Sequence, residues 1–307
     1  MTAEARVVAE PRIGARQVVS VYVALMKPRI IELLLLTTLP VMFLAQGGVP
    51  PLGLVLATIV GGTLSAGSAN ARNCVVDADI DARMRRTRRR PLARAQISRR
   101  DALVFGLALG VVSTLMLGLL VNWLSAALAM AANAFYVVGY TIVLKPRTTQ
   151  NIVWGGAAGC FPTLIGWTAV RDQLGWPAFV LFLVVFLWTP PHFWALAIRY
   201  REDYARAGVP MLPAVAPTRL VTRQILGYAV VTVLTSLVMW PVSGTGPVYP
   251  VLATVLGVAF VVEAWRLWRR ASVTDELSSL KPMRLFHLSN VYLTLLFLAV
   301  ALVPFTS

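Results

Sequence analysis

Apolar residues run through the chain in nine stretches, each near the roughly 20 residues that a transmembrane helix needs. In lipid the backbone must satisfy its own hydrogen bonds, so a spanning chain is helical or a closed barrel. The run LVFGLALGVVSTLMLGLL, for example, lacks the alternation of a barrel strand. The pattern predicts an all-α integral membrane protein with nine transmembrane helices, at 30–46, 53–72, 101–120, 123–144, 151–170, 177–198, 224–242, 248–268 and 285–304.

The composition excludes an ordinary soluble domain. Hydrophobic residues make up 58% of the chain, charged residues 13%, and the mean hydropathy is +0.72. Soluble chains are about 45–50% apolar and about 25% charged. The net charge of +15 would indicate a nucleic-acid partner in a soluble protein, but this hydropathy favours membrane lipid instead, and no nucleic acid is expected.

The positive charges predict the orientation of the chain. When Lys and Arg are sorted by loop, 27 of the 28 fall on one face of the membrane and only Arg171 falls on the other. Cytoplasmic loops collect these residues, so the N-terminus is predicted in the cytoplasm and the C-terminus outside. Residues 1–20 are predicted to form a cytoplasmic N-terminal arm without a cleaved signal peptide, and residues 21–307 a single nine-helix domain.

Two features describe the internal organisation of that domain. The second and the sixth span are each followed by a long polar cytoplasmic loop with acids, and then by two closely spaced spans. This weak repetition predicts two four-helix halves plus one extra helix. The two cysteines, Cys74 and Cys160, fall at opposite ends of the membrane, so no disulfide between them is expected.

Oxygen-bearing side chains follow the second span at helical spacing. Asn73, Asp77 and Asp81 recur at every fourth position of NARNCVVDADIDARMRRTRRRPL, which places them on one face of a continuing helix. Mg²⁺ takes such oxygen ligands and is often completed by substrate phosphates. The neighbouring Arg72 and Arg86 are suited to the remaining phosphate oxygens. The spacing predicts a metal-diphosphate site near the cytoplasmic face.

A plainer interpretation remains for part of this segment. An isolated pair of aspartates at this spacing is more often a solvated loop that sets topology, and the arginine run is well explained as an anchor on anionic lipid. The leading asparagine and a second acid pair after the sixth span, Glu202 and Asp203, favour the functional interpretation. Only two or three of the arginines are expected to touch a substrate.

These residues resemble the first signature of the UbiA-type intramembrane prenyltransferases. The resemblance covers nearly the whole chain from about residue 20. It is closest to the branch of that superfamily that farnesylates haem B, through KPRIIELLLLTTLP at 27–40, TPPHFWALAIRYREDYARAGVPMLP at 189–213 and FHLSNVYLTLLF at 286–297. It implies nine helices around a central cavity, and two aspartate-rich motifs that hold Mg²⁺ and an isoprenyl diphosphate.

The resemblance also implies roles for individual residues. Metal ligands are matched by Asn73, Asp77, Asp81 and Asp203, and diphosphate contacts by Arg29, Arg72, Tyr140, Thr141 and Lys145. Of these, Asp77, Asp81, Asp203 and Lys145 are expected to be catalytic. One departure from the superfamily pattern stands out, since Tyr200 and Tyr204 occupy positions where many members carry acids. That leaves the role of Glu202 open and allows a metal site with fewer carboxylates.

The implied reaction joins farnesyl diphosphate to a vinyl group of haem B with addition of water. Haem A synthase or cytochrome oxidase assembly proteins are the implied partners that receive the product. His192 and His287 are the only histidines, and both lie near the cytoplasmic ends of spans. Imidazole is a common haem ligand. A hydrogen bond between helices is the other explanation for each of them.

Three further functions remain open at this point. A related prenyltransferase would use a quinone precursor or chlorophyllide as acceptor, and the block at 189–213 argues against it. A transporter would also bury polar residues among its spans, but it would form no covalent product. A membrane anchor bound to acidic lipid would leave the series Asn73, Asp77 and Asp81 unexplained.

Overall fold

The computed structural model describes residues 14–244 and 246–306, and every regular element in these ranges is helical. Within these ranges, eight helices are long and apolar enough to cross a membrane. The predicted all-α membrane class is therefore confirmed. The long helices are α2 (Pro28–Gln46), α3 (Leu52–Val76), α5 (Arg99–Leu120), α6 (Trp123–Ala134) with the π-helix η1 (Phe135–Leu144), α9 (Trp176–Arg199), α12 (Thr218–Ser243), α13 (Val248–Ala271) and α15 (Pro282–Thr306), which follows α14 (Leu277–Leu280).

The count of nine is not confirmed, because the predicted span at 151–170 is divided into three pieces. They are α7 (Asn151–Gly155), the 3₁₀-helix η2 (Gly156–Cys160) and α8 (Phe161–Arg171). The break lies against α9, where a Cβ on Gly156 would sit 2.8 Å from Cγ2 of Thr189. Next along α9 come Pro190 and Pro191, which cannot donate backbone hydrogen bonds. Irregular backbone at membrane depth is tolerated where it packs against protein, and η2 packs against α9.

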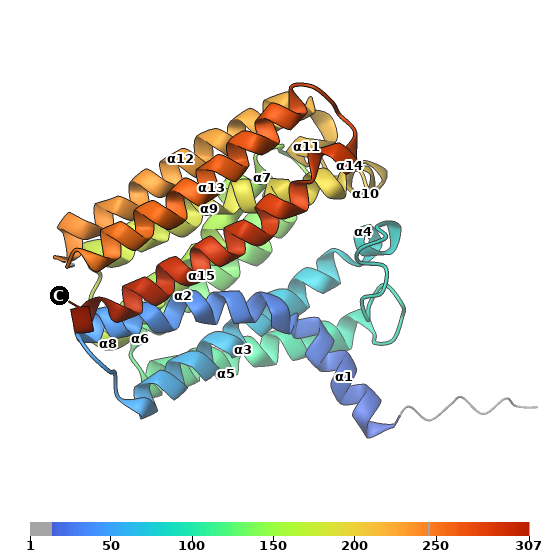
Figure 1. Cartoon of the computed structure of the whole chain (residues 1–307). Coiled ribbons are helices and arrows are strands. Elements are labelled where there is room, and N and C mark those ends of the chain that lie inside the picture. The colour runs from blue at the N-terminus through green and yellow to red at the C-terminus, as the bar shows by residue number, and fades with distance from the viewer. Residues whose placement is uncertain (1–13, 245, 307) are drawn as a thin grey trace, which may run out of the picture.

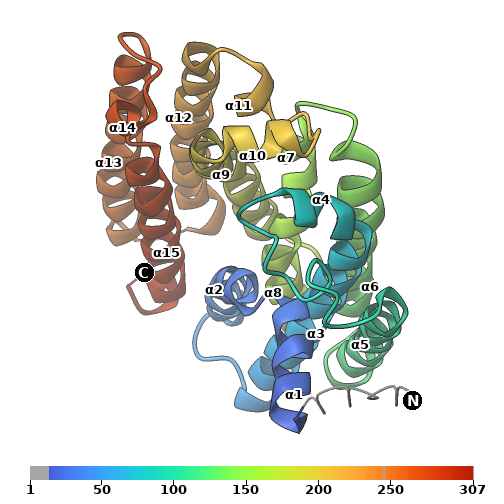
Figure 2. The ribbon, with the colours of Figure 1, turned by 90° about the vertical axis from the view of Figure 1, so that its right-hand side faces the viewer.

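Short helices gather at one end of the bundle, and Figure 1 shows α4 (Ala78–Arg83), α10 (Arg201–Arg206) and α14 there, opposite the C-terminus. Figure 2 looks onto this end and shows α4 and α10 lying over the middle of the surrounding long helices. α1 (Ala15–Met26) and α11 (Leu212–Val215) complete the elements. The predicted N-terminal arm at 1–20 overlaps the start of α1, and its residues 1–13 lie outside the described residues. Both acid-bearing loops thus meet at one end.

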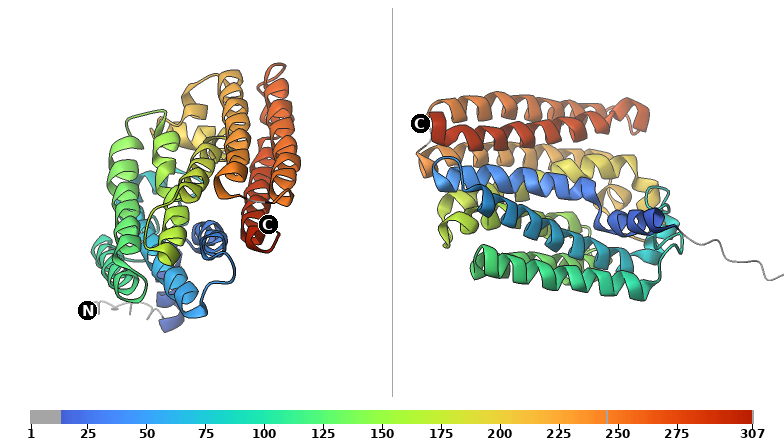
Figure 3. Two further views of the ribbon diagram at one scale, coloured as in Figure 1. Left: turned by 90° about the vertical axis from the view of Figure 1, so that its left-hand side faces the viewer. Right: turned by 90° about the horizontal axis from the view of Figure 1, so that it is seen from below.

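Packing between long helices closes the bundle. Helix α2 packs against α8 on one side and α15 on the other, while α9 packs against both α12 and α15. The largest buried cluster, with Trp194, Phe260, Tyr292 and Phe297, lies among α9, α12, α13 and α15. Figure 3 shows the same arrangement from the opposite end and from below. The short helices that carry the acid motifs are therefore attached to long helices held in place by packing.

Exposed side chains along the long helices are apolar, as expected for contact with lipid. On α5, Val111 is 61% exposed and Leu119 is 72% exposed. A soluble protein rarely leaves such large apolar faces open to water. Cys74 and Cys160 are both buried free cysteines.

Candidate active site

The first acid motif lies where α3 passes into α4. The backbone N–H of Asp77 donates to the carbonyl of Asn73 at 2.9 Å, and that of Asp81 donates to the carbonyl of Asp77 at 2.8 Å. These bonds continue the helical geometry across the junction. The side chains of Asn73, Asp77 and Asp81 therefore lie on one face, as the spacing predicts. All three residues are buried. Their burial sets them apart from Asp79, whose side chain is 73% exposed.

A compact polar cluster joins this motif to the π-helix η1. Nζ of Lys145 lies 2.5 Å from Oδ2 of Asp77, and Nδ2 of Asn73 donates to the same oxygen at 2.8 Å and to Oγ1 of Thr141 at 3.0 Å. The backbone N–H of Lys145 donates to the carbonyl of Tyr140, five residues back. A π-helix turns the chain by less per residue than an α-helix, and such stretches are frequent at functional sites. Here it brings Thr141 and Lys145 together onto the first motif.

Lys27 belongs to the same cluster and was not predicted as a site residue. Its Nζ donates to Oδ1 of Asn73 at 2.6 Å. Lys27 has a left-handed backbone (φ 55°) and precedes Pro28, the first residue of α2, so the turn between α1 and α2 directs the side chain inward. Burial lowers the pKa of Lys27 to about 8. The available signal was the Lys-Pro pair at the start of a span, which sets a turn but does not indicate where the lysine points.

Asp81, the third residue of the motif, forms a separate ion pair. Nη1 of Arg90 lies 2.7 Å from Oδ2 of Asp81. The hydroxyl of Thr87 donates to the carbonyl of Asp81 at 3.2 Å, which holds the loop after α4 against it. Burial lowers the pKa of Arg90, but the charge of Asp81 outweighs this and the pKa is raised overall. Arg90, one arginine of the basic run, is therefore paired with the first acid motif.

The second acid motif meets the first through Arg86. The backbone N–H of Arg86 donates to Oδ2 of Asp203 at 3.3 Å, and its guanidinium donates to the hydroxyl of Tyr204, also at 3.3 Å. Asp203 is buried and pairs with Arg206, while Glu202 is exposed. Burial raises the pKa of Tyr204. The loops after α3 and after α9, far apart in sequence, thus form one polar region.

The two tyrosines at the departures from the superfamily pattern both support arginines. Arg86 lies over the ring of Tyr200 at 5.9 Å from its centroid, and Arg199 lies over the same ring at 6.0 Å. Such cation–π contacts hold a guanidinium without neutralising it. An acid at these positions would pair with the arginines instead. The substitution of tyrosine for acid therefore leaves this side of the site more positive.

The donor set fits a hard divalent cation. Oδ1 of Asp77 is buried and has no hydrogen-bond partner among the described residues, which is costly unless a ligand completes it. Within those residues no group of three His, Cys, Asp or Glu is close enough to hold a metal by itself. Each predicted carboxylate ligand instead pairs with a cation, Asp77 with Lys145, Asp81 with Arg90 and Asp203 with Arg206. Amide, carboxylate and substrate oxygens together would have to complete the coordination.

Three residues expected at the diphosphate make no side-chain hydrogen bond among the described residues. Arg29 is exposed at the start of α2. Arg72 points toward α5, where its Cγ would lie 2.9 Å from a Cβ on Gly106, and its Nε is buried without a hydrogen-bond partner among the described residues. Tyr140 stacks on Tyr136 at 5.6 Å between ring centroids. Their roles in binding stay predictions.

The two histidines occupy different environments. The ring of His192 stacks between Trp188, at 4.1 Å between centroids, and Phe286, at 4.5 Å. Its Nδ1 hydrogen-bonds Oγ of Ser289 at 2.8 Å, so the hydrogen bond between helices expected as the plainer alternative is present. His287 is exposed next to Phe286. Their role as haem ligands stays a prediction.

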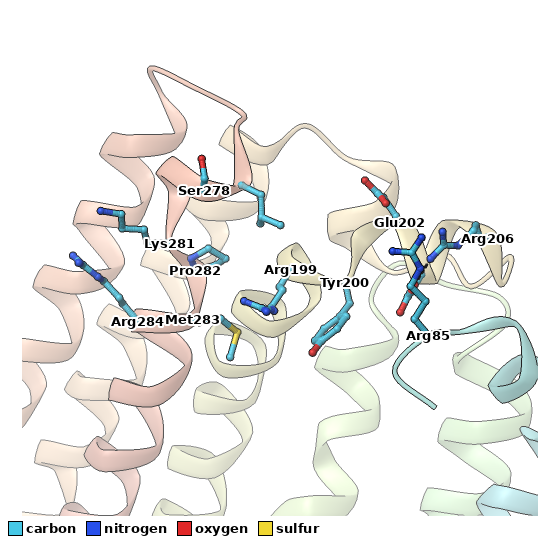
Figure 4. Close-up of a pocket in the computed structure, with 12 residues that line it drawn as sticks. Arg85, Arg199, Tyr200, Glu202, Arg206, Ser278, Lys281, Pro282, Met283 and Arg284 are labelled. Carbon is cyan, nitrogen blue, oxygen red and sulfur yellow. Dashed lines mark hydrogen bonds and ion pairs between the residues drawn. The ribbon is translucent and has the colours of Figure 1, made fainter. Parts of the chain in front are cut away.

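A cavity of about 680 Å³ opens beside Asp203, at the same end of the bundle. Figure 4 shows Arg199 and Tyr200 at its centre, with Arg85, Glu202 and Arg206 on one side and the α14–α15 segment on the other. Its volume is in the range of about 300–1,000 Å³ that is usual for small-molecule sites. The cavity and the two acid motifs define a site at one end of the helix bundle.

The class of protein follows from sequence comparison. Residues 34–291 match the UbiA prenyltransferase family, so the chain belongs to that family. Helical bundles of the same fold recur in solved structures. One, of a digeranylgeranylglyceryl phosphate synthase, has a TM-score of 0.75 at 16% identity and covers 93% of this chain and 98% of its own. A UbiA homologue from Archaeoglobus fulgidus bound to DMAPP and Mg²⁺ has a TM-score of 0.64 at 14% identity, over 91% of this chain and 98% of its own.

The particular relatives are far closer in sequence. A protoheme IX farnesyltransferase from a Nocardioides species is 63% identical over 293 residues, 95% of this chain and 93% of the relative. The protoheme IX farnesyltransferase of Cutibacterium acnes is 61% identical over 294 residues, 96% of this chain and 87% of the relative. The resemblance inferred from the motifs is confirmed, and with it a multi-pass membrane prenyltransferase.

Proposed function

We propose that this chain catalyses the protohaem IX farnesyltransferase reaction. It transfers the farnesyl group of farnesyl diphosphate to a vinyl group of haem B, with addition of water, and releases haem O and diphosphate. The name carried by relatives 56–63% identical over most of the chain supports this acceptor. The observation that carries the chemistry is the polar cluster in which Asn73 and Lys145 contact Asp77, and Lys27 contacts Asn73.

Departure of the diphosphate requires that its growing negative charge be neutralised. Lys145 and Lys27 supply ammonium groups in a buried setting, where electrostatic stabilisation is strong. An anion beside Lys27 would also counteract the burial that lowers its pKa. Arg86, Arg90 and Thr141 can donate to the remaining diphosphate oxygens. These donors hold the leaving group while the bond from the farnesyl carbon to oxygen breaks.

The residues proposed to hold Mg²⁺ are Asn73, Asp77, Asp81 and Asp203. The A. fulgidus homologue, bound to Mg²⁺, supports this choice of metal, and the unpartnered Oδ1 of Asp77 supports its place. When bound, Mg²⁺ neutralises diphosphate charge as a Lewis acid. The carboxylates orient it, and the lysines act on the same leaving group from the η1 and α2 sides. Glu202 is exposed and has no part in this proposal.

The acceptor needs no deprotonation before it reacts. An electron-rich vinyl carbon of haem B bonds to the farnesyl carbon, and the cation left next to the porphyrin ring is stabilised by conjugation. Water then adds to that cation and loses a proton, which gives the hydroxyethylfarnesyl chain of haem O. Apolar helix walls exclude water from the farnesyl cation until the acceptor reaches it.

The orientation and partners form part of the proposal. The cation distribution supports a place in the cytoplasmic membrane, with the N-terminus and the site on the cytoplasmic side and the C-terminus outside. Haem O is insoluble in water and must pass to a membrane-bound acceptor. Haem A synthase or cytochrome oxidase assembly proteins are the partners proposed to receive it.

The decisive experiment offers purified protein farnesyl diphosphate, Mg²⁺ and either haem B or 4-hydroxybenzoate. Mass spectrometry is expected to detect haem O from the first mixture and no prenylated phenol from the second. Prenylation of the phenol without conversion of haem B would contradict the proposed acceptor. Movement of a solute across vesicles, with no covalent product in either mixture, would favour a transporter.

A further inference from the structure

The cavity beside Asp203 has a chemical character unlike that of the acid motifs. Its lining includes Arg85, Arg199 and Arg206 with the apolar side chains of Leu277 and Met283. Arg206 pairs with Asp203, but neither Arg85 nor Arg199 forms an ion pair with an acid among the described residues. In Figure 4 these guanidiniums lie on either side of Tyr200. Glu202 and Asp203 also line the cavity, but the cations outnumber them, so a ligand with apolar surface and more than one negative charge suits it.

An aromatic stack lies along the same two helices, beyond the residues that line the cavity. Met283 on its wall is one turn of α15 from Phe286, and Arg199 is two turns of α9 from His192. His192 is stacked between Phe286 and Trp188, and α9 and α15 pack against each other. A flat macrocycle bound in the cavity would thus have arginines at its polar edge, with the aromatic stack one to two helical turns beyond the lining.

On the basis of the function proposed above, we infer that Arg85 and Arg199 bind the two propionates of the haem acceptor. Haem B carries both propionates on one edge and its vinyl groups on the opposite side of the ring. Arginine forms strong, charge-assisted hydrogen bonds to carboxylates. Binding of the propionate edge in the cavity turns the vinyl side inward, away from the cytoplasmic rim. The cavity then determines the acceptor and its orientation.

Tyr200, one of the two tyrosines that replace acids, explains why Arg199 is available. Tyr200 supports Arg199 from one face of its ring without neutralising it. A carboxylate at position 200 would compete directly with a propionate for that guanidinium. Tyrosine in place of an acid at position 200 therefore favours an acceptor that carries two negative charges. Lys281 and Arg284 stand on the rim, where Figure 4 shows their head groups turned outward, and add positive potential.

The test compares haem B with its propionate dimethyl ester, which keeps the macrocycle and vinyl groups but loses both charges. Rates are measured with the full-length protein in phosphatidylcholine nanodiscs, at saturating farnesyl diphosphate and Mg²⁺. The wild-type protein is expected to show a KM for the ester at least about tenfold above that for haem B, the ratio equivalent to about 1.4 kcal/mol. Arg85→Gln and Arg199→Gln are each expected to raise the KM for haem B about tenfold. The KM values for the ester and for farnesyl diphosphate stay unchanged.

Matched controls come from the same face of the protein. Arg88→Gln changes an exposed arginine of the same loop outside the cavity, and Arg223→Gln does so on α12. Both are expected to keep wild-type KM values. Equal losses for haem B and its ester, or no loss for either, would overturn the inference. So would an effect that disappears in phosphatidylcholine and returns with anionic lipid, because the cavity would then hold a lipid phosphate.

A binding measurement separates this inference from the proposed function. Haem B and its dimethyl ester are titrated into each protein without farnesyl diphosphate, and binding is followed by the haem absorption band. Tighter binding of haem B than of the ester, lost in Arg85→Gln and Arg199→Gln, supports the propionate site independently of turnover. If haem O forms but both variants bind the two haems like wild type, the proposed function stands and this inference fails.

Discussion

At the residue scale, neighbouring acids of one motif have opposite environments. Asp77 is buried with a short contact to Lys145, whereas Asp79 is 73% exposed and pairs with Arg99 on the surface. Exposed ion pairs contribute about 0–1 kcal/mol. A buried charge that loses its partner costs far more, because the partner is left uncompensated. The same chemical change at the two positions therefore has very different consequences.

Asp77→Asn is expected to reduce farnesyl transfer by at least about a hundredfold, the range found when one electrostatic group is removed from an active site. It removes the charge that Lys145 contacts and that the proposed metal needs. Asp79→Asn, the matched control, is expected to keep near wild-type activity. Steady-state formation of haem O by both variants checks this. Equal losses in the two would mean that the motif acts through overall charge and not through the cluster.

Lys27 offers a second test at this scale. Lys27→Asn keeps a residue that tolerates the left-handed backbone and removes the ammonium that contacts Asn73. Activity is expected to fall at least about tenfold, since a charge-assisted hydrogen bond is worth about 1.5–3 kcal/mol. The kcat and the KM for farnesyl diphosphate are the measurements. Lys281→Asn, at the matching left-handed turn before Pro282, controls for backbone effects through its Tm. Unchanged kinetics in Lys27→Asn would remove Lys27 from the site.

At the element scale, the irregular stretches position the site. The π-helix η1 directs Thr141 and Lys145 to Asn73 and Asp77, and the break at α7 and η2 makes room for it. A Cβ on Gly155 would lie only 2.1 Å from Cδ2 of Tyr140. Only glycine permits that approach. The broken segment and the π-helix therefore form one packed unit.

Gly155→Ala is expected to displace Tyr140 and, through η1, Lys145. Overpacking of this kind costs about 1–3 kcal/mol. Both a lower Tm and a lower kcat are expected, measured by thermal unfolding in detergent and by haem O formation. Gly159→Ala is the control, because a Cβ there meets nothing within 4 Å. Wild-type behaviour of Gly155→Ala would show that η1 does not depend on this contact.

The elements also show where sequence is sufficient and where it is not. The long spans and the shared face of Asn73, Asp77 and Asp81 follow from local hydropathy and helical period, so they could be predicted. The span at 151–170 was predicted from its apolar content, but the helix is broken where Gly156 meets Thr189 across the bundle. Lys27 was missed for the same reason, because its target lies 46 residues away. Contacts between distant segments leave no local pattern.

At the scale of the whole molecule, one end concentrates charge and the other is nearly free of it. Figure 1 places α4, α10 and α14 at one end and the C-terminus at the opposite one. At that opposite end Arg171 donates to the carbonyl of Ala45 at 2.6 Å, which ties this cation to the end of α2. A chain built this way has one orientation in which its arginines stay on the cytoplasmic side.

Single new cysteines test that orientation, because Cys74 and Cys160 are buried. Arg88→Cys lies in the loop after α4 and Gln173→Cys between α8 and α9, both at exposed positions. A membrane-impermeant maleimide is expected to label the first only in inside-out vesicles and the second only in right-side-out vesicles. The reverse pattern would contradict the proposed topology.

The three ion pairs of the acid motifs have a consequence for the order in which ligands bind. Lys145, Arg90 and Arg206 each occupy a carboxylate that Mg²⁺ would need, and each becomes free for an anion when that carboxylate changes partner. When both ligands bind, the carboxylates would pair with Mg²⁺ and the lysine and arginines with the diphosphate. If only one of the two binds, one side of each protein ion pair would be left without an opposite charge. Reciprocal linkage follows, because each ligand raises the binding affinity of the other by the same factor.

Calorimetry with a farnesyl thiodiphosphate is expected to show weak binding of Mg²⁺ alone and at least about tenfold tighter binding of Mg²⁺ when the diphosphate analogue is present. Equal affinity with and without the diphosphate analogue would mean that the acids bind metal without releasing their cations.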